Sequence, residues 1–157
     1  LCGLGARDIL RVEAGYPLYG HEIDEGTNPF CASLGWAVKL NKDFIGKEAL
    51  LEFKRERSRV GFLMLQRAVP RQGYEVYCSG DSNKEVIGKV SSGIYSPNLD
   101  KFIGMAYVEK SFACVGTPVE LKIRDKFYKA KIVKFPFVEI RTYNRKYKVQ
   151  SIECKLS

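Results

Sequence analysis

The chain has 157 residues, of which 45% are hydrophobic and 28% are charged, and its formal net charge at pH 7 is +8. This composition predicts a folded globular chain with a sizeable core and argues against intrinsic disorder. The sequence contains no apolar run near the roughly 20 residues of a membrane-spanning helix, and the positive charge favours an acidic partner.

The first expected element is a short helix near the start of the chain. Residues 8–13 place apolar positions at helical spacing. Gly15 and Pro17 then end this helix, because glycine tolerates left-handed backbone and proline resists helix continuation.

Two more elements are expected before the middle of the chain. Residues 34–40, LGWAVKL, predict a buried strand in which Trp36 packs in the interior. Residues 46–57 predict a second helix, because apolar residues recur there at helical spacing. Residues 1–57 are too few and too rich in loops to form a core alone, so they should pack on another part of the protein.

Six short β-type runs follow, separated by turn residues: 59–65, 74–78, 85–96, 102–109, 118–124 and 127–135. Their regular spacing predicts an antiparallel barrel or sandwich. The expected fold class is therefore α+β and mainly β. A helical and loop segment, residues 1–57, precedes a C-terminal antiparallel β-barrel, residues 58–138, and a basic tail, residues 139–157.

The cysteines and basic residues narrow the possible chemistry. Five cysteines are far apart without a CxxC pair, and there is one histidine. This pattern argues against a disulfide framework and a zinc site, and favours a reducing compartment. The basic clusters at 54–59 and 141–148 are interpreted as a solvated face and a tail, because the sequence matches no nucleic-acid-binding pattern.

Several motifs in order resemble one protein family. The stretch GLGARDILRVEAGYPLYGHEID is followed by TNPFCASLGWAVKLNKDFIGKEAL, and later by VPRQGY, GKVSSG, YSP, IGMAYV and FPFV. Together they resemble the aminomethyltransferases, the T-proteins of the glycine cleavage system, over nearly all of the chain up to residue 138. Members of that family are more than twice as long. The resemblance implies that this sequence is their C-terminal portion, the end of the folate-binding region followed by the barrel.

The resemblance also implies an activity. Family members take an aminomethyl group held on the lipoyl arm of the H-protein, pass its carbon to tetrahydrofolate and release ammonia. The expected catalytic aspartate lies upstream of this chain, which is therefore expected to be inactive alone. No metal is implied. The implied location is the mitochondrial matrix in a eukaryote or the cytoplasm in a bacterium.

Three residues are candidate folate contacts. The resemblance implies that Glu13, in RVEAG, binds the pterin ring, and a carboxylate suits this role because its two oxygens accept paired N–H donors. The alternative is a helix-end glutamate paired with Arg11 or Arg7. Tyr19 either lines the folate pocket or simply packs. Lys42 stands where family members can place a folate-contacting arginine, and lysine keeps the charge but loses the bidentate fork.

Other functions stay open on the sequence. One is a non-catalytic folate-binding relative or the C-terminal region of a folate-linked demethylating oxidase. The non-catalytic relatives in iron–sulfur assembly carry a cysteine in the segment matching residues 42–48, where this chain has none. A basic module that binds nucleic acid is a further possibility, which the charge permits and no motif supports.

Overall fold

The computed structural model describes residues 2–80 and 84–139, and the predicted basic tail beyond residue 139 lies outside the described residues. The N-terminal segment holds the elements α1 (Leu4–Glu13), η1 (Gly35–Ala37) and α2 (Lys47–Glu52). The strands are β1 (Arg57–Met64), β2 (Glu75–Cys78), β3 (Val86–Ser96), β4 (Lys101–Glu109), β5 (Pro118–Ile123) and β6 (Lys126–Val133), with η2 (Lys110–Phe112) after β4.

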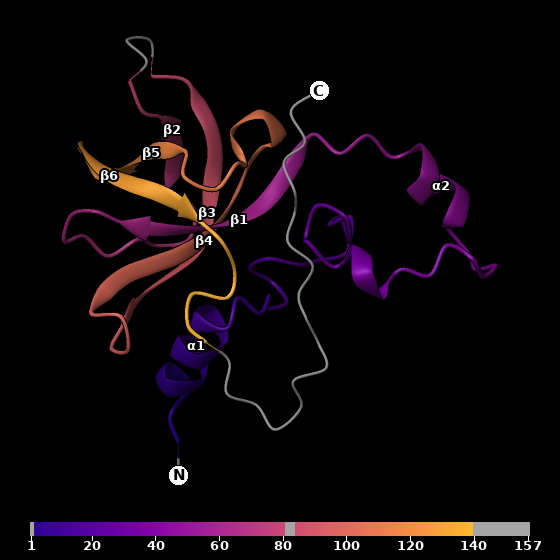
Figure 1. Cartoon of the computed structure of the whole chain (residues 1–157), viewed down its shortest axis with the longest axis horizontal. Coiled ribbons are helices and arrows are strands. Elements are labelled where there is room, and N and C mark those ends of the chain that lie inside the picture. Colours follow the sequence, from indigo (N-terminus) through magenta and orange to yellow (C-terminus); the bar gives the residue numbers. More distant parts are fainter. Residues whose placement is uncertain (1, 81–83, 140–157) are drawn as a thin grey trace.

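The strands form a closed barrel in the order β1-β4-β3-β2-β5-β6, and β6 pairs back with β1. Every pairing is antiparallel. The spacing of β-type runs left a barrel or a sandwich open, and the antiparallel barrel expected over residues 58–138 is confirmed. Figure 1 shows α1 against one end of the barrel and α2 on an arm that extends away from it.

The barrel interior is the main hydrophobic core. Strand side chains alternate between the two faces, and the inward set from all six strands forms one buried cluster. Its members are Val60, Phe62, Met64, Val76, Ile87, Val90, Ala106, Val108, Val119, Leu121, Ala130 and Ile132.

A second cluster attaches α1 to the outside of the barrel. Val12 of α1 is fully buried against Ile103 and Met105 of β4. Phe135 and Phe137, which follow β6, pack against the same cluster. Both faces of this part of the sheet are therefore covered, and the last turn of α1 is held at the barrel wall.

Two glycines make room for these phenylalanine rings. Gly15 has φ +73°, a left-handed conformation, and a Cβ there would lie 2.7 Å from the Phe135 ring. A Cβ on Gly61 would lie 2.9 Å from the Phe137 ring. A larger residue at either position would displace the ring that it meets.

Three expectations for the N-terminal segment are wrong. Residues 34–40 do not form a strand, because their regular part is the short helix η1. Trp36 is 62% exposed rather than buried. The helix expected over 46–57 is limited to α2, which has no buried residue. The helical periodicity alone therefore did not specify burial.

The cysteines depart in part from the sequence-based interpretation. Cys2, Cys31 and Cys78 are free thiols. Cys114 is disulfide-bonded. The disulfide at Cys114 departs from the sequence-based argument against a disulfide framework.

Candidate functional site

Glu13 is the last residue of α1, and it is buried where the helix meets the barrel. The residue is 1% exposed. Its Oε1 accepts a hydrogen bond from the Ser96 hydroxyl, and its Oε2 accepts one from the Asn98 amide at 2.7 Å. Its backbone oxygen accepts the N–H of Phe137 at 2.9 Å. The turn between β3 and β4 therefore holds this carboxylate, and none of its described hydrogen bonds comes from an arginine of α1.

A second carboxylate, Glu22, is fully enclosed in the loop after α1. Its Oε2 accepts hydrogen bonds from Arg11 Nη1 at 2.7 Å and from the Leu18 N–H at 2.9 Å. Arg11 also donates to the Ser92 hydroxyl of β3 at 2.8 Å and to Asp8 at 2.7 Å. Oε1 of Glu22 has no hydrogen-bond partner in the described part of the chain. Arg11 thus joins the helix, the loop and the barrel.

Arg59 of β1 connects the barrel to the N-terminal segment from the other side. Its Nε donates to the Ala32 oxygen and its Nη1 to the Gly15 oxygen, both at 2.9 Å. The guanidinium lies 4.8 Å from the centre of the Phe135 ring, a cation–π contact. Loss of hydration on burial lowers the pKa of Arg59. Arg59 is only 5% exposed. The interpretation of the basic cluster at 54–59 as a solvated face is therefore wrong for this residue.

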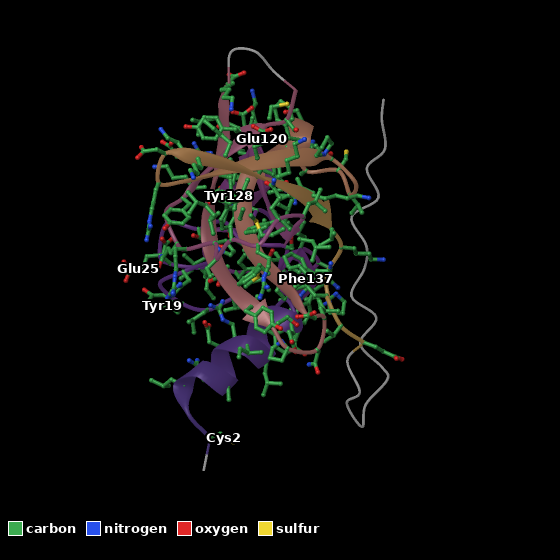
Figure 2. The ribbon with its side chains drawn as sticks, turned by 90° about the vertical axis from the view of Figure 1, so that its left-hand side faces the viewer. Cys2, Tyr19, Glu25, Glu120, Tyr128 and Phe137 are labelled. Atoms are coloured by element: carbon green, nitrogen blue, oxygen red, sulfur yellow. The ribbon has the colours of Figure 1, made fainter. Side chains whose placement is uncertain are left out.

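The other two predicted folate contacts lie at the surface. Tyr19 is 66% exposed, in a loop where it bridges to Ile23. Figure 2 shows Tyr19 at the outside of the molecule, near Glu25. Lys42 is exposed in the irregular segment before α2. No described hydrogen bond or ion pair joins either residue to Glu13, so their roles stay predictions.

Strand β3 carries a bulge that shapes a neighbouring cavity. Its register with β4 shifts between Val90 and Ser92, which makes Ser91 the extra residue. The Ser91 hydroxyl donates to the Met105 oxygen at 3.1 Å. The Ser91 oxygen lies 3.3 Å from Nδ1 of His21, a hydrogen bond when Nδ1 carries the proton. The bulge thereby ties the loop after α1 to the barrel.

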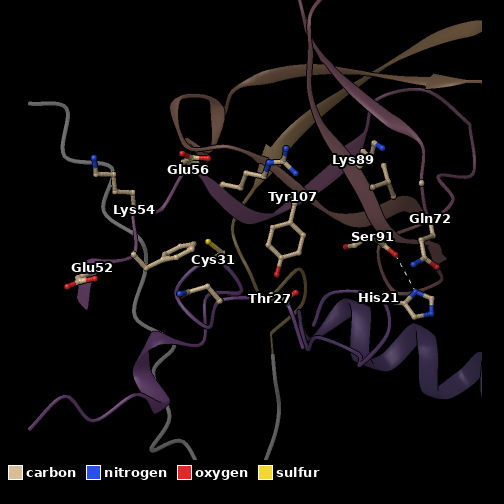
Figure 3. Close-up of a pocket in the computed structure, with 16 residues that line it drawn as sticks. His21, Thr27, Cys31, Glu52, Lys54, Glu56, Gln72, Lys89, Ser91 and Tyr107 are labelled. Carbon is tan, nitrogen blue, oxygen red and sulfur yellow. Dashed lines mark hydrogen bonds between the residues drawn. The ribbon is translucent and has the colours of Figure 1, made fainter. Parts of the chain in front are cut away.

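A cavity of about 810 Å³ lies beside this bulge. The loop with His21 and Thr27, the linker at 52–57 and the barrel strands β3 and β4 line it. Figure 3 shows Tyr107 of β4 crossing this space with its hydroxyl directed toward the loop. None of the three predicted folate contacts lines the cavity.

The cavity carries more positive than negative side chains. Lys54, Arg57 and Lys89 line it together with the carboxylates of Glu52 and Glu56. None of these five residues belongs to an ion pair within the described ranges. The excess of cations suits an anionic ligand or partner.

Tyr107 gives the structure a dependence on alkaline pH. Its hydroxyl donates to the backbone carbonyl oxygen of Glu22 at 2.7 Å. Burial is the main cause that raises the pKa of Tyr107 from 10 to about 12. The folded chain therefore favours the neutral phenol. This contribution to stability is complete below pH 10 and is lost as the pH rises through about 12.

We expect Tyr107→Phe to remove part of the alkaline loss of stability. Urea denaturation at intervals from pH 8 to 12 would show a shallower fall in the free energy of unfolding above pH 10 for the variant than for the unchanged chain. Parallel curves for the two proteins would contradict this role of Tyr107.

The sequence patterns do not single out the residues that fix Glu13 and the loop. Ser96 and Asn98 flank Pro97 between two β-type runs, and nothing in that pattern indicates a buried partner. A buried role for Arg59 has one signal, because this charged residue opens an otherwise apolar run, RVGFLML. Glu22 offers no such signal, since acidic residues are common in loops.

The described residues offer no candidate for a metal centre or a membrane-spanning helix. The described residues contain no group of three or more His, Cys, Asp or Glu side chains that could hold a metal ion. Among the described helices, none is long and apolar enough to cross a membrane.

Comparison with known proteins gives consistent matches. Residues 57–139 match the family described as "Glycine cleavage T-protein C-terminal barrel domain", and residues 1–42 match the "GCVT N-terminal domain". An aminomethyltransferase of Symbiobacterium thermophilum is 52% identical over 141 residues, covering 87% of this chain and 36% of that protein. An aminomethyltransferase of Bacillus subtilis is 46% identical over 141 residues, covering 87% and 38%.

A solved structure agrees with these matches. The crystal structure of glycine cleavage system aminomethyltransferase T from Bartonella henselae has a TM-score of 0.80 and 36% identity, and the match covers 87% of this chain and 39% of that one. The chain therefore spans a little over a third of the length of these relatives. With the barrel family matched over residues 57–139 and the same topology observed, the chain belongs to the glycine cleavage T-protein family and contains its C-terminal barrel.

Proposed function

We propose that this chain is the C-terminal part of a tetrahydrofolate-dependent aminomethyltransferase. In the complete enzyme, the carbon of an aminomethyl group passes from a lipoylated H-protein to tetrahydrofolate, and ammonia leaves. The main support for this proposal is the 52% identity over 141 residues to an aminomethyltransferase. The match extends across both the N-terminal segment and the barrel.

The residues of this chain contribute binding and orientation to that activity. Glu13 accepts N–H donors of the pterin ring, Tyr19 borders the pocket, and Lys42 offers a positive charge to the folate. The catalytic aspartate comes from polypeptide upstream of this chain. Tetrahydrofolate supplies the nitrogen that receives the carbon, and holding the reactants in register accounts for much of the rate.

The chemistry of Glu13 fits this role, whereas its surroundings require a rearrangement. Each carboxylate oxygen accepts one described hydrogen bond and can accept another. Paired N–H donors of a pterin therefore suit it. With Glu13 1% exposed, however, a ligand must displace part of its cover before contact.

Complementation tests the proposed function. A fusion protein would carry the Symbiobacterium aminomethyltransferase up to its matched region, followed by this chain. We expect the fusion protein to form methylenetetrahydrofolate from aminomethylated H-protein, and the chain alone to form none. A folded fusion protein that neither binds tetrahydrofolate nor catalyses transfer, beside an active Symbiobacterium enzyme, would contradict the proposal.

Glu13→Ala in the fusion protein is expected to raise the dissociation constant of tetrahydrofolate about 10-fold to 100-fold. The reason is the net loss of about one hydrogen bond to a charged acceptor, which contributes roughly 1.5–3 kcal/mol. Isothermal titration calorimetry measures the constant, and thermal denaturation checks the fold.

Glu13→Gln is the matched variant for this measurement. It keeps the shape of the side chain but replaces one acceptor oxygen by a donor, so it should also weaken binding. Unchanged affinity in both variants would remove Glu13 from the folate site.

A further inference from the structure

The two side chains that bind the Glu13 carboxylate differ in exposure. Ser96 is completely buried, whereas Asn98 is exposed. The Asn98 Nδ2 lies 2.7 Å from Oε2 of Glu13, and Glu13 itself is 1% exposed. A ligand that approaches from solvent therefore meets the Asn98 amide before the carboxylate.

The two donors also differ in how firmly they are held. The Ser96 hydroxyl donates to Oε1 of Glu13, and its oxygen accepts the Leu99 N–H at 3.2 Å, so two partners fix it. For Asn98, the described residues provide its side chain with the single hydrogen bond to Glu13. Because Asn98 is exposed, water can replace that bond when the amide turns outward.

The Asn98 amide belongs to the same donor class as an aminopyrimidine edge. Both present N–H groups to a carboxylate oxygen, and the exposed Asn98 amide covers Oε2 of Glu13. Because Glu13 is 1% exposed, a ligand with two parallel N–H donors reaches both oxygens only after the amide has turned away.

We propose that Asn98 is an internal latch on the ligand-binding carboxylate, and that Ser96 is the fixed residue that positions it. This inference rests on the proposed role of Glu13 in folate binding. The latched form excludes the ligand, so the apparent dissociation constant equals the intrinsic constant divided by the fraction of molecules that are unlatched. Asn98 therefore lowers affinity, although it contacts the same group that binds the ligand.

Asn98→Ala in the fusion protein tests the latch. We expect the dissociation constant of tetrahydrofolate to fall about threefold to tenfold. In the variant, no charge-assisted hydrogen bond from residue 98 has to break before the ligand can bind Glu13. The gain should lie in the association rate constant, measured by stopped-flow fluorescence. A residue that merely contacts the ligand would change the dissociation rate constant instead.

Ser96→Ala is the matched variant from the same turn. It removes the inner donor and leaves the latch, so it should weaken binding several-fold. Asn98→Gly removes the same amide by a second route and replaces Asn98→Ala if that variant does not fold. Thermal denaturation of each protein shows which variants are folded.

The outcomes separate the latch from the function on which it rests. If Glu13→Ala weakens binding while removal of the Asn98 amide leaves the association rate constant unchanged or lowers affinity, the latch is wrong and the role of Glu13 stands. If Glu13→Ala has no effect on affinity, the role of Glu13 and the latch both fail.

Discussion

Arg59→Met is expected to lower the free energy of unfolding by about 3–5 kcal/mol, because two buried carbonyl groups lose their donor at about 1–3 kcal/mol each and a cation–π contact disappears. The carbonyls belong to Gly15 and Ala32. Methionine fills much of the volume but donates no hydrogen bond. The variant should therefore loosen the N-terminal segment from the barrel.

Arg57→Met is a close control for Arg59→Met. Arg57 lies two residues away on the same strand and is exposed, so its replacement should change stability by less than about 0.5 kcal/mol. Urea denaturation gives both values, and limited proteolysis shows whether cleavage begins in the N-terminal segment. Equal stabilities of the two variants would show that Arg59 does not connect the two parts.

Arg11→Met is expected to lower the free energy of unfolding by about 3 kcal/mol, because it leaves the Glu22 carboxylate buried without its ion-pair partner. Glu22 is fully enclosed, and Arg11 lies 2.7 Å from it. The variant also removes the hydrogen bond to Ser92 at 2.8 Å. The helix and the following loop should both lose their attachment to β3.

The double variant Arg11→Met, Glu22→Leu distinguishes a buried charge from a lost contact. Replacing both members of a buried ion pair by apolar residues removes the unpaired charge, so much of the lost stability should return. Thermal and urea denaturation of the two single variants and the double variant complete the cycle. A double variant as unstable as the sum of the single variants would show that the pair is not coupled.

Both arginines bear on function because they hold the residues around Glu13. Arg59 fixes Gly15, which follows α1 closely, and Arg11 lies in α1 itself. Loss of either contact would let the last turn of α1 move against the β3–β4 turn that binds the carboxylate. The stability experiments therefore examine the scaffold of the proposed folate contact separately from its chemistry.

The barrel was predictable from the sequence because its strands are marked by local signals. Runs rich in β-branched and aromatic residues are separated by turn residues at regular intervals, and each run corresponds to one observed strand. Closure into a barrel, as opposed to a sandwich, depends on which strands pair. The pairing of β6 with β1 joins positions about 70 residues apart and has no local signature.

The N-terminal segment was predicted less well, since its elements depend on partners outside themselves. Trp36 was expected to be buried because of its size, yet it is 62% exposed. A helix was expected over residues 46–57, but α2 covers only Lys47–Glu52, and none of its residues is buried. Helix length and burial are set by tertiary packing more than by propensity.

The sequence by itself determined the family, the mainly β class and Glu13 as a candidate contact. These features depend on motifs and strand spacing, which involve residues close together in the sequence. Only the tertiary structure revealed that Ser96 and Asn98 hold that carboxylate, and that Arg59 is internal. The hydrogen bonds of Glu13 cross more than 80 positions of sequence. The sequence around a polar residue in a turn or strand does not indicate such a distant hydrogen-bond partner. The two residues become neighbours only when the barrel forms.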